Sequence, residues 1–150
     1  YKAGATMDEL EEYLTHLREH TIVYFVVDDL VYLKRGGRIS AVTAAVGNLL
    51  NIKPMISILE DGSLQSVGKI KGSKRVFSEF VNLMHKHNAN TKDYRIEIMQ
   101  ADCPETGEAF VEVLKKEFGE DITYDLQIVG PVIASHCGPG TLGLIFYGDR

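Results

Sequence analysis

Residues 21–27, TIVYFVV, constrain the fold of this chain more than any other segment. The run contains no charged residue and is followed at once by two aspartates. A strand with one wet face alternates apolar and polar residues, whereas an unbroken apolar run is typical of a strand covered on both faces. The chain has 150 residues, 45% of them hydrophobic, which is enough for one domain with a core of its own.

Helical patterns flank this run. Thr6 and Glu9 form a capping box ahead of the first predicted helix. Gly36-Gly37 separates two shorter helical pieces, and the second piece carries an apolar stripe over residues 42–50. Ser40 is a favourable N-cap for this second piece, and Ser73 and Pro104 open the two remaining predicted helices.

The other patterns are those of strands, and an Asp61-Gly62 turn joins two of them in a hairpin. Together these patterns predict about six strands and about five helices. Because both hairpins and helices link the strands, we predict an α+β fold, a mixed and largely antiparallel sheet covered by one layer of helices. The predicted strand segments are residues 21–27, 53–70 (the hairpin), 93–103, 122–130 and 141–148.

Charge and composition exclude some classes of protein. The net charge is -5 and the isoelectric point is near 5.5, whereas nucleic-acid binders usually carry a basic excess. No apolar stretch is long enough to span a bilayer, and no secretory signal pattern is present. Cys103 and Cys137 are far apart, so we interpret them as free thiols in a reducing cytoplasm. The chain begins with Tyr1 and not Met, so we expect it to be part of a longer protein.

The segment ASHCGPGTLGLIF, residues 134–146, carries the most reactive-looking pair of side chains. His136 and Cys137 are adjacent in a segment that we predict to be extended, where neighbouring side chains point to opposite faces. Such neighbours cannot form the hydrogen bond that a thiol–imidazole nucleophile requires. We therefore interpret Cys137 as a small packed thiol.

The glycines that follow match the letters of a dinucleotide-binding loop. Gly138, Gly140 and Gly143 have that spacing, but they lead into a predicted strand, whereas the loop requires a helix. Pro139 also removes one of the amide donors that would hold a phosphate. We therefore expect these glycines to permit a sharp turn and a close approach of the backbone to another group.

Two interpretations of His136 stay open. It is either a core histidine that hydrogen-bonds the backbone, or a donor placed to hold an anionic group of a ligand. His16 and His20 are four residues apart on the first helix, and we interpret them as a solvated face and not as metal ligands. The sequence predicts no metal site and no cofactor.

Four stretches together resemble one known family. VDDLVYLKRGGRIS (27–40), NIKPMISILEDGSL (51–64), GKIKGSKRVF (68–77) and HCGPGTLGL (136–144) are similar, in order and spacing, to the DegV family. The resemblance covers nearly all of the chain. It implies that residues 1–150 form a single domain, equivalent to the second of two α/β domains, and that the first domain lies outside this sequence.

This resemblance implies a function and its partners. DegV-family proteins bind long-chain fatty acids, and some are the binding subunit of a bacterial fatty acid kinase, presenting the acyl carboxylate to a separate kinase subunit. A non-catalytic, cytoplasmic, lipid-binding protein is thus implied, with a palmitate-like or oleate-like ligand. Its further partners would be the kinase subunit and the missing N-terminal domain. The apolar stripe over residues 42–50 and the strand over residues 55–58 would either line a tunnel for the acyl chain or pack in the core.

The resemblance also assigns roles to individual residues. His136 would hydrogen-bond the carboxylate or lie beside it, in a turn formed with Gly138 and Gly140. Lys71 stands where the family often has arginine, and it keeps the charge but not the two-pronged donor geometry. Arg38 is retained, either as an anchor of its turn through carbonyl groups or as part of a partner surface. Two other classes of function remain as alternatives: a phosphocarrier that uses His136 and a small-ligand sensor.

Overall fold

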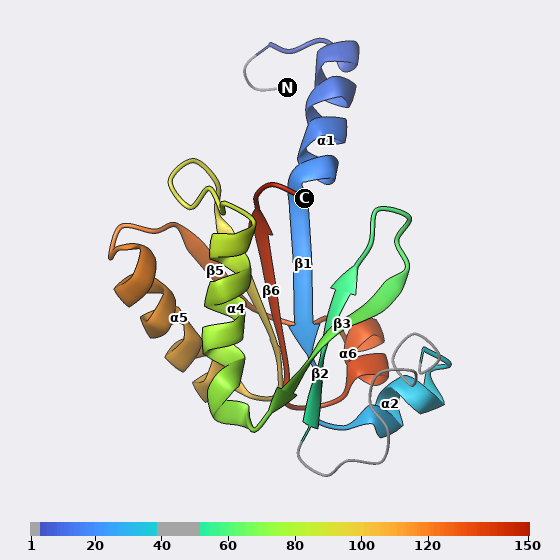
Figure 1. Ribbon diagram of the computed structural model, residues 1–150. Helices are drawn as coiled ribbons and strands as arrows, with labels where there is room; N and C mark the ends of the chain where they lie inside the picture. Colours follow the sequence, from blue (N-terminus) through green and yellow to red (C-terminus); the bar gives the residue numbers. More distant parts are fainter. Residues whose placement is uncertain (1–3, 39–51) are drawn as a thin grey trace.

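A six-stranded sheet forms the centre of the molecule in the computed structural model, which describes residues 4–38 and 52–150 (Figure 1). Its strand order is β3-β2-β1-β6-β4-β5, and β4 and β5 are parallel while all other neighbours are antiparallel. The predicted mixed, largely antiparallel sheet is confirmed. The strands are β1 (Thr21–Val26), β2 (Ile52–Ile58), β3 (Leu64–Lys71), β4 (Ile96–Ala101), β5 (Tyr124–Ile128) and β6 (Thr141–Tyr147).

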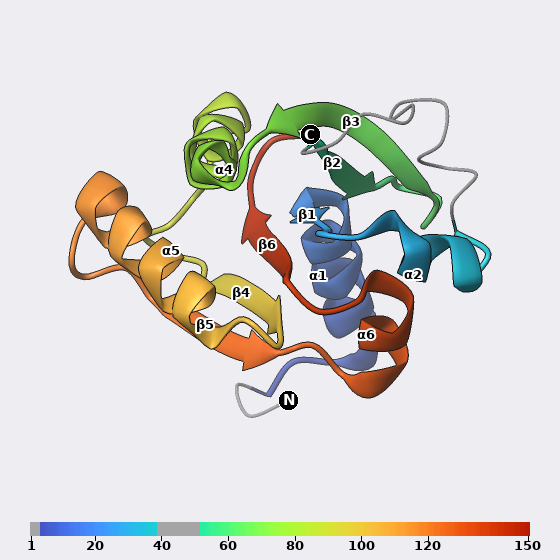
Figure 2. The ribbon, with the colours of Figure 1, turned by 90° about the horizontal axis from the view of Figure 1, so that it is seen from below.

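Helices cover both faces of this sheet. Figure 2 shows α4 and α5 on one side and α2 and α6 on the other, so the predicted single layer of helices is wrong. The physical reason lies in the alternation of the strands, which carry apolar side chains toward both faces. The helices are α1 (Met7–His20), α2 (Leu30–Arg35), α4 (Val76–Lys86), α5 (Pro104–Phe118) and α6 (Pro131–Cys137), with the 3₁₀ turn η1 (Ser73–Arg75) ahead of α4.

The two faces of β1 are buried to different degrees. Ile22, Tyr24 and Val26 are buried in the larger core cluster, beneath α4 and α5. Val23 and Phe25 point to the other face and are only half-buried. The prediction of burial on both faces is therefore correct for the first face and only partly correct for the second, where Val23 and Phe25 are left partly uncovered.

The second face carries a smaller core cluster. Val27, Leu33, Ile56 and Cys137 are buried together there, and Phe25 packs against them. Leu33 comes from α2 and Cys137 from α6, so this cluster joins both helices to the sheet. The two short helices are thus held in place by a few buried contacts.

Residues 131–137 form helix α6 and not the extended segment that we predict. Pro131 stands in the first turn of the helix and Gly138 follows its last residue, which are the usual start and stop signals. The β-branched residues Val132 and Ile133 favour a strand locally, and the helical signals outweigh them. His136 therefore lies in the last turn of a helix and not at a strand end.

Two other predicted helix starts have different outcomes. Ser73 does not cap α4, because it opens the 3₁₀ turn η1 and the α-helix begins at Val76. Gly72, with a φ of 83°, sets the chain direction there in place of a serine cap. The helix predicted after Ser40, with its apolar stripe over residues 42–50, lies outside the described residues.

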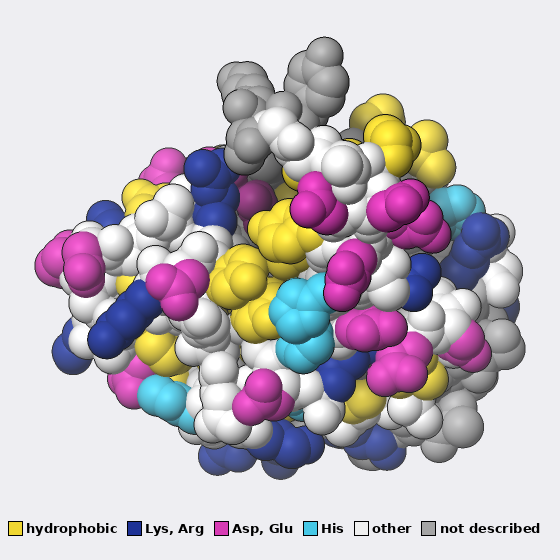
Figure 3. All heavy atoms as spheres, turned by 90° about the horizontal axis from the view of Figure 1, so that it is seen from above, with side chains coloured by type: hydrophobic (Ala, Val, Ile, Leu, Met, Phe, Trp, Pro, Cys, Tyr) yellow, Lys and Arg dark blue, Asp and Glu magenta, His cyan; other side chains and the backbone are white. Residues whose placement is uncertain are grey.

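Helix α1 extends beyond the end of the sheet, and none of its side chains is buried (Figure 1). The predicted capping box of Thr6 and Glu9 is present. His16 Nε2 lies 2.8 Å from the Tyr147 hydroxyl and the His20 ring stacks on Tyr147, so these histidines contact β6 and are not a purely solvated face. Figure 3 looks down on this end of the molecule, where hydrophobic and histidine side chains lie beside acidic ones.

Two features are absent from residues 4–38 and 52–150. No group of three or more histidine, cysteine, aspartate or glutamate side chains there is placed to hold a metal ion. No helix in those ranges has the length and apolar character needed to cross a membrane.

The larger core cluster sets the stability of the domain. Phe80 of α4 is fully buried in this cluster, with its ring centroid 5.4 Å from that of Phe110 on α5. We expect Phe80→Ala to lower the free energy of unfolding by about 3–5 kcal/mol, because it leaves a cavity that the neighbours fill only in part. Urea denaturation of the 150-residue chain measures this change.

Ile128→Ala is the matched control, because that side chain is 76% exposed. Its effect should stay within about 0.5 kcal/mol of zero. Equal losses in the two variants would mean that the α4–α5 face is not the main core.

Candidate functional site

Helices α2 and α6 approach each other closely at two glycines. A Cβ atom on Gly138 would lie 2.6 Å from Cγ of Tyr32 on α2. A Cβ atom on Gly36, at the end of α2, would overlap the imidazole ring of His136 on α6, 3.0 Å from its Cγ and closer still to Nδ1. The Tyr32 ring of α2 therefore fills the space beside Gly138, and the His136 ring of α6 fills the space beside Gly36. This contact positions His136.

His136 has an unusual environment for a histidine. Its Nδ1 is buried and has no hydrogen-bond partner among residues 4–38 and 52–150. The ring forms no hydrogen bond with any described residue, so the interpretation of His136 as a core histidine bonded to the backbone finds no support here. The edge of the ring that carries Nδ1 faces Gly36, and the opposite edge, Cδ2–Nε2, therefore points away from α2.

A cavity of about 420 Å³ lies beside this ring, on the α2–α6 face of the sheet. We call it the His136 pocket. Most of its lining is apolar, and Val23 and Phe25, the half-buried residues of β1, form part of it. The lining residues are Val23, Tyr24, Phe25, Leu33, Arg38, Ile58, Leu64, Met99, Val129, Val132, Ile133, His136, Cys137, Thr141, Gly143 and Ile145.

Cys137 also borders the His136 pocket, which corrects the prediction that it faces away from His136. Adjacent residues of a helix are separated by about 100° and not by the 180° of a strand, so both side chains reach the same cavity. Burial raises the pKa of the Cys137 thiol and also that of Cys103. Both cysteines are free thiols, and Cys137 has the environment of an inert, packed residue.

Thr141 holds the turn that follows α6. Its buried hydroxyl lies 2.8 Å from the carbonyl oxygen of Gly138 and 3.1 Å from that of Cys137, so it satisfies carbonyls that the end of the helix leaves free. Gly138 and Gly140 have φ values of 81° and 78°, as the predicted sharp turn requires. A Cβ atom on Gly140 would lie 2.6 Å from Cγ of Asp28, which confirms the predicted close approach.

Only some of the remaining predicted site residues lie at the His136 pocket. Arg38 lines the His136 pocket, and its Nη1 donates to the carbonyl oxygen of Gly36 at 2.6 Å, as an anchor of the turn would. Lys71 is exposed at the end of β3 and does not line the pocket. Gly140 borders a different hollow, which also includes Lys53. The structure therefore brings Arg38 and His136 together at the pocket, whereas Gly138, Gly140 and Lys71 do not line it.

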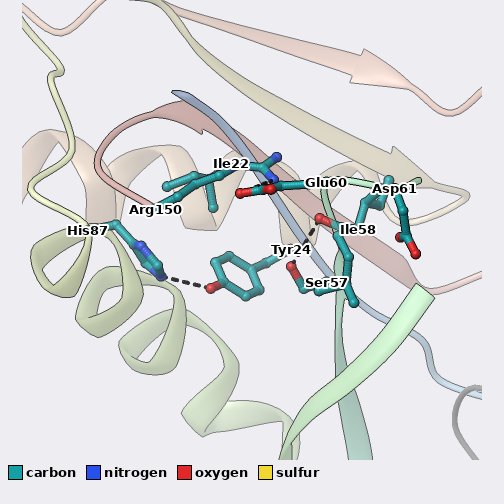
Figure 4. Close-up of a pocket in the computed structure, with 9 residues that line it drawn as sticks. Ile22, Tyr24, Ser57, Ile58, Glu60, Asp61, His87 and Arg150 are labelled. Atoms are coloured by element: carbon teal, nitrogen blue, oxygen red, sulfur yellow. Dashed lines mark hydrogen bonds and ion pairs between the residues drawn. The ribbon is translucent and has the colours of Figure 1, made fainter. Parts of the chain in front are cut away.

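A second hollow, of about 480 Å³, opens on the other side of β1 (Figure 4). Its polar groups are already partnered within the protein. His87 Nδ1 donates to the carbonyl oxygen of Asp149 at 2.6 Å, and its Nε2 is hydrogen-bonded to the Tyr24 hydroxyl at 2.8 Å. Arg150 donates to the Thr21 carbonyl oxygen, and burial raises the pKa of Tyr24.

The two hollows differ in what they offer a ligand. In the hollow of Figure 4, the polar side chains form hydrogen bonds that join the end of α4, β1 and residues 149–150, and these bonds support the fold. The His136 pocket has a largely apolar wall and an imidazole with no described hydrogen bond, together with the exposed Val132 (73%) and Ile133 (59%) at its border. We take the His136 pocket as the candidate functional site.

Sequence reasoning missed two residues of this site. The sequence predicts Gly36 only as a break between helices, and Thr141 only as the start of a strand. The glycine pair hints at a close contact, but nothing in the sequence says which side chain would fill the space at Gly36. Thr141 follows a Gly-Pro-Gly turn, which is a weak signal for a hydroxyl that binds carbonyls.

Comparisons with known proteins agree with this fold. A family model described as "Uncharacterised protein, DegV family" matches residues 1–149, and the chain belongs to the DegV family. A DegV domain-containing protein of Clostridium perfringens is 38% identical over 149 residues, which are 99% of this chain and 50% of that protein. The chain therefore spans about half the length of the relatives it matches.

Solved structures show the same similarity. A DegV-family protein from Thermus thermophilus described as fatty-acid-binding has a TM-score of 0.83 and 30% identity, covering 98% of this chain and 52% of that one. DegV from Bacillus subtilis, named a fatty acid binding protein, has a TM-score of 0.80 and 27% identity, covering 99% and 52%. Fatty Acid Kinase (Fak) B3 of Streptococcus pneumoniae, loaded with linoleic acid, shares the fold with a TM-score of 0.84 at 22% identity, over 98% and 51%.

The burial of Cys137 generates a test. Because its pKa is raised and its thiol is buried, we expect iodoacetamide to alkylate Cys137 more slowly in the folded chain at pH 8 than in urea. Mass spectrometry of digested samples taken over time measures the rate at each cysteine. Equal rates in folded and unfolded protein would contradict a packed, unreactive thiol.

Proposed function

We propose that this chain binds a long-chain fatty acid in the His136 pocket, with the carboxylate at His136 and the acyl chain against the apolar wall. The observation that carries the proposal is an imidazole ring that lines a largely apolar cavity and whose Nδ1 faces Gly36 without a hydrogen-bond partner among the described residues. The 30% and 27% identical structures described as fatty-acid-binding support the same ligand class.

The chemistry of the pocket suits an amphiphile with one polar end. Its volume of about 420 Å³ is in the range of ligand cavities, and each methylene group removed from water contributes about 0.8 kcal/mol. The carboxylate needs donors, which Nε2–H of His136 and the guanidinium of Arg38 can provide. Arg38 then has two roles, because it also anchors its own turn through Gly36.

The proposal includes a second half of the site, outside this chain. The chain spans about half the length of its relatives, and exposed apolar side chains border the pocket, so we propose that residues 1–150 are one domain of a two-domain protein. The other domain would cover Val132 and Ile133 and complete the carboxylate site. We place this protein in the cytoplasm.

We further propose that the bound acid is presented to a separate kinase subunit. This step rests on the resemblance to kinase binding subunits and on a shared fold with Fak B3, at an identity that supports the fold alone. Lys71 is exposed and apart from the pocket, which suits a contact with a partner better than a contact with the ligand. The protein itself would then be non-catalytic.

A phosphocarrier or a small polar-ligand sensor that uses His136 is less well supported. A phosphoryl group on Nε2 would carry two charges into a largely apolar cavity, where Arg38 is the one described cation of the lining. Incubation with acetyl phosphate followed by intact mass measurement tests the phosphocarrier directly.

His136 gives the sharpest test of ligand binding. A hydrogen bond to a carboxylate in a water-poor cavity is worth about 1.5–3 kcal/mol, so His136→Ala in the natural full-length protein should weaken oleate binding by roughly 10-fold to 100-fold. Isothermal titration calorimetry measures the affinity. Ser135→Ala, on the exposed side of the same helix, is the control. Wild-type affinity in His136→Ala would refute the assigned role.

Lys71 tests the presentation step separately from binding. We expect Lys71→Ala to leave oleate affinity nearly unchanged, because the residue does not line the pocket, and to slow acyl phosphorylation by the cognate kinase. The two measurements are calorimetry and the initial rate of acyl phosphate formation. Lys69→Ala, earlier on the same exposed face of β3, is the control charge change, and an unchanged rate in Lys71→Ala would make Lys71 a solvated residue only.

A further inference from the structure

We infer that Gly36 is the positioning residue for His136, and that the space left by its missing side chain determines which edge of the imidazole meets the ligand. We call this space the Gly36 notch. The inference rests on the proposed function, because it concerns how the carboxylate-binding histidine is oriented. Neither Gly36 nor its helix α2 is assigned a role at the site by the sequence.

Gly36 is not required by the backbone. Its φ and ψ are -76° and -4°, a helical conformation that every residue type adopts. Its neighbour Gly37 is the opposite case, with a φ of 73° and no atom within 4 Å of the position that a Cβ would occupy. Gly37 is therefore needed for its conformation and Gly36 for the space it leaves.

That space is filled by the His136 ring. A Cβ atom on Gly36 would lie 3.0 Å from Cγ and 3.1 Å from Cε1 of the ring, and closer to Nδ1 than real Cβ atoms come to other groups. The obstructed group is a rigid ring on the last turn of α6, not the tip of a flexible chain. Any side chain at position 36 would thus push the imidazole out of its present orientation.

The notch also determines the chemistry of the ring. Nδ1 is buried against Gly36 without a partner, so a proton on Nδ1 would be a buried donor with no acceptor. Nε2 lies on the ring edge opposite Gly36, so it is the nitrogen left to bond a ligand, and only the tautomer with the proton on Nε2 donates there. This tautomer gives the pocket a hydrogen-bond donor, which a carboxylate requires.

Arg38 keeps the notch in shape. Its Nη1 donates to the Gly36 carbonyl oxygen at 2.6 Å, and its backbone amide donates to the Leu33 carbonyl oxygen at 2.8 Å. These bonds fix the turn that carries Gly36 at the end of α2, so the notch has its shape before the ligand arrives. Preorganisation of this kind lowers the entropy that binding would otherwise cost.

A double-mutant cycle tests this inference in the natural full-length protein. We expect Gly36→Ala to weaken oleate binding by roughly 10-fold to 100-fold, as loss of the His136 hydrogen bond does. In a His136→Ala background the same change should have almost no further effect, because the ring that it displaces is gone. Calorimetry provides the four affinities. Independent, additive losses would overturn the inference.

Gly37→Ala is the matched control at the next residue. Its positive φ makes alanine strained, so we expect a lower melting temperature with oleate affinity unchanged. If Gly36→Ala does not fold by itself, recovery of folding in Gly36→Ala/His136→Ala supports the notch, and failure of the double variant to recover contradicts it.

Nuclear magnetic resonance separates this inference from the proposed function, because it needs no ligand. Ring ¹⁵N shifts of His136 in the free protein should show the Nε2–H tautomer, and Gly36→Ala should change them while Gly37→Ala should not. If wild type does not bind oleate but the shifts behave as expected, the proposed function fails and the inference stands. If oleate binds and Gly36→Ala binds equally well, the inference fails alone.

Discussion

The close contact between α2 and α6 is the interaction on which the rest of this site depends. Both helices are short, with six and seven residues, and helices of that length are not stable without tertiary contacts. Two glycines let each helix receive an aromatic ring of the other, Tyr32 at Gly138 and His136 at Gly36. Beneath them, Leu33 and Cys137 are buried together against the sheet.

The sheet adds a second constraint, because its two faces are covered unequally. Beneath α4 and α5 the buried side chains form one large cluster, which supports the fold. On the α2–α6 face, two short helices cannot cover every apolar side chain of β1, and Val23 and Phe25 border a cavity instead. An incomplete core on one face of a well-packed sheet provides an apolar binding cavity without weakening the fold.

The same arrangement distinguishes the two hollows beside β1. Tyr24 and His87 lie in a network of hydrogen bonds that joins α4 to residues 149–150, so their polarity serves the fold. His136 has no such network and only the Gly36 notch around its Nδ1. A buried polar atom without a partner is costly, and such atoms are typical of functional sites.

Much of the fold follows from local signals in the sequence: β1 from its apolar run, the β2–β3 hairpin from Asp61-Gly62, α1 from its capping box and α5 from Pro104. These signals need no knowledge of distant contacts. The prediction that His136 and Cys137 lie in an extended segment is wrong, because Pro131 and Gly138 delimit a helix there. The orientation of His136 and the place of Lys71 outside the pocket come from the tertiary structure alone. Both depend on contacts between segments far apart in the chain, such as Gly36 with His136, and such contacts leave no periodic pattern in a sequence.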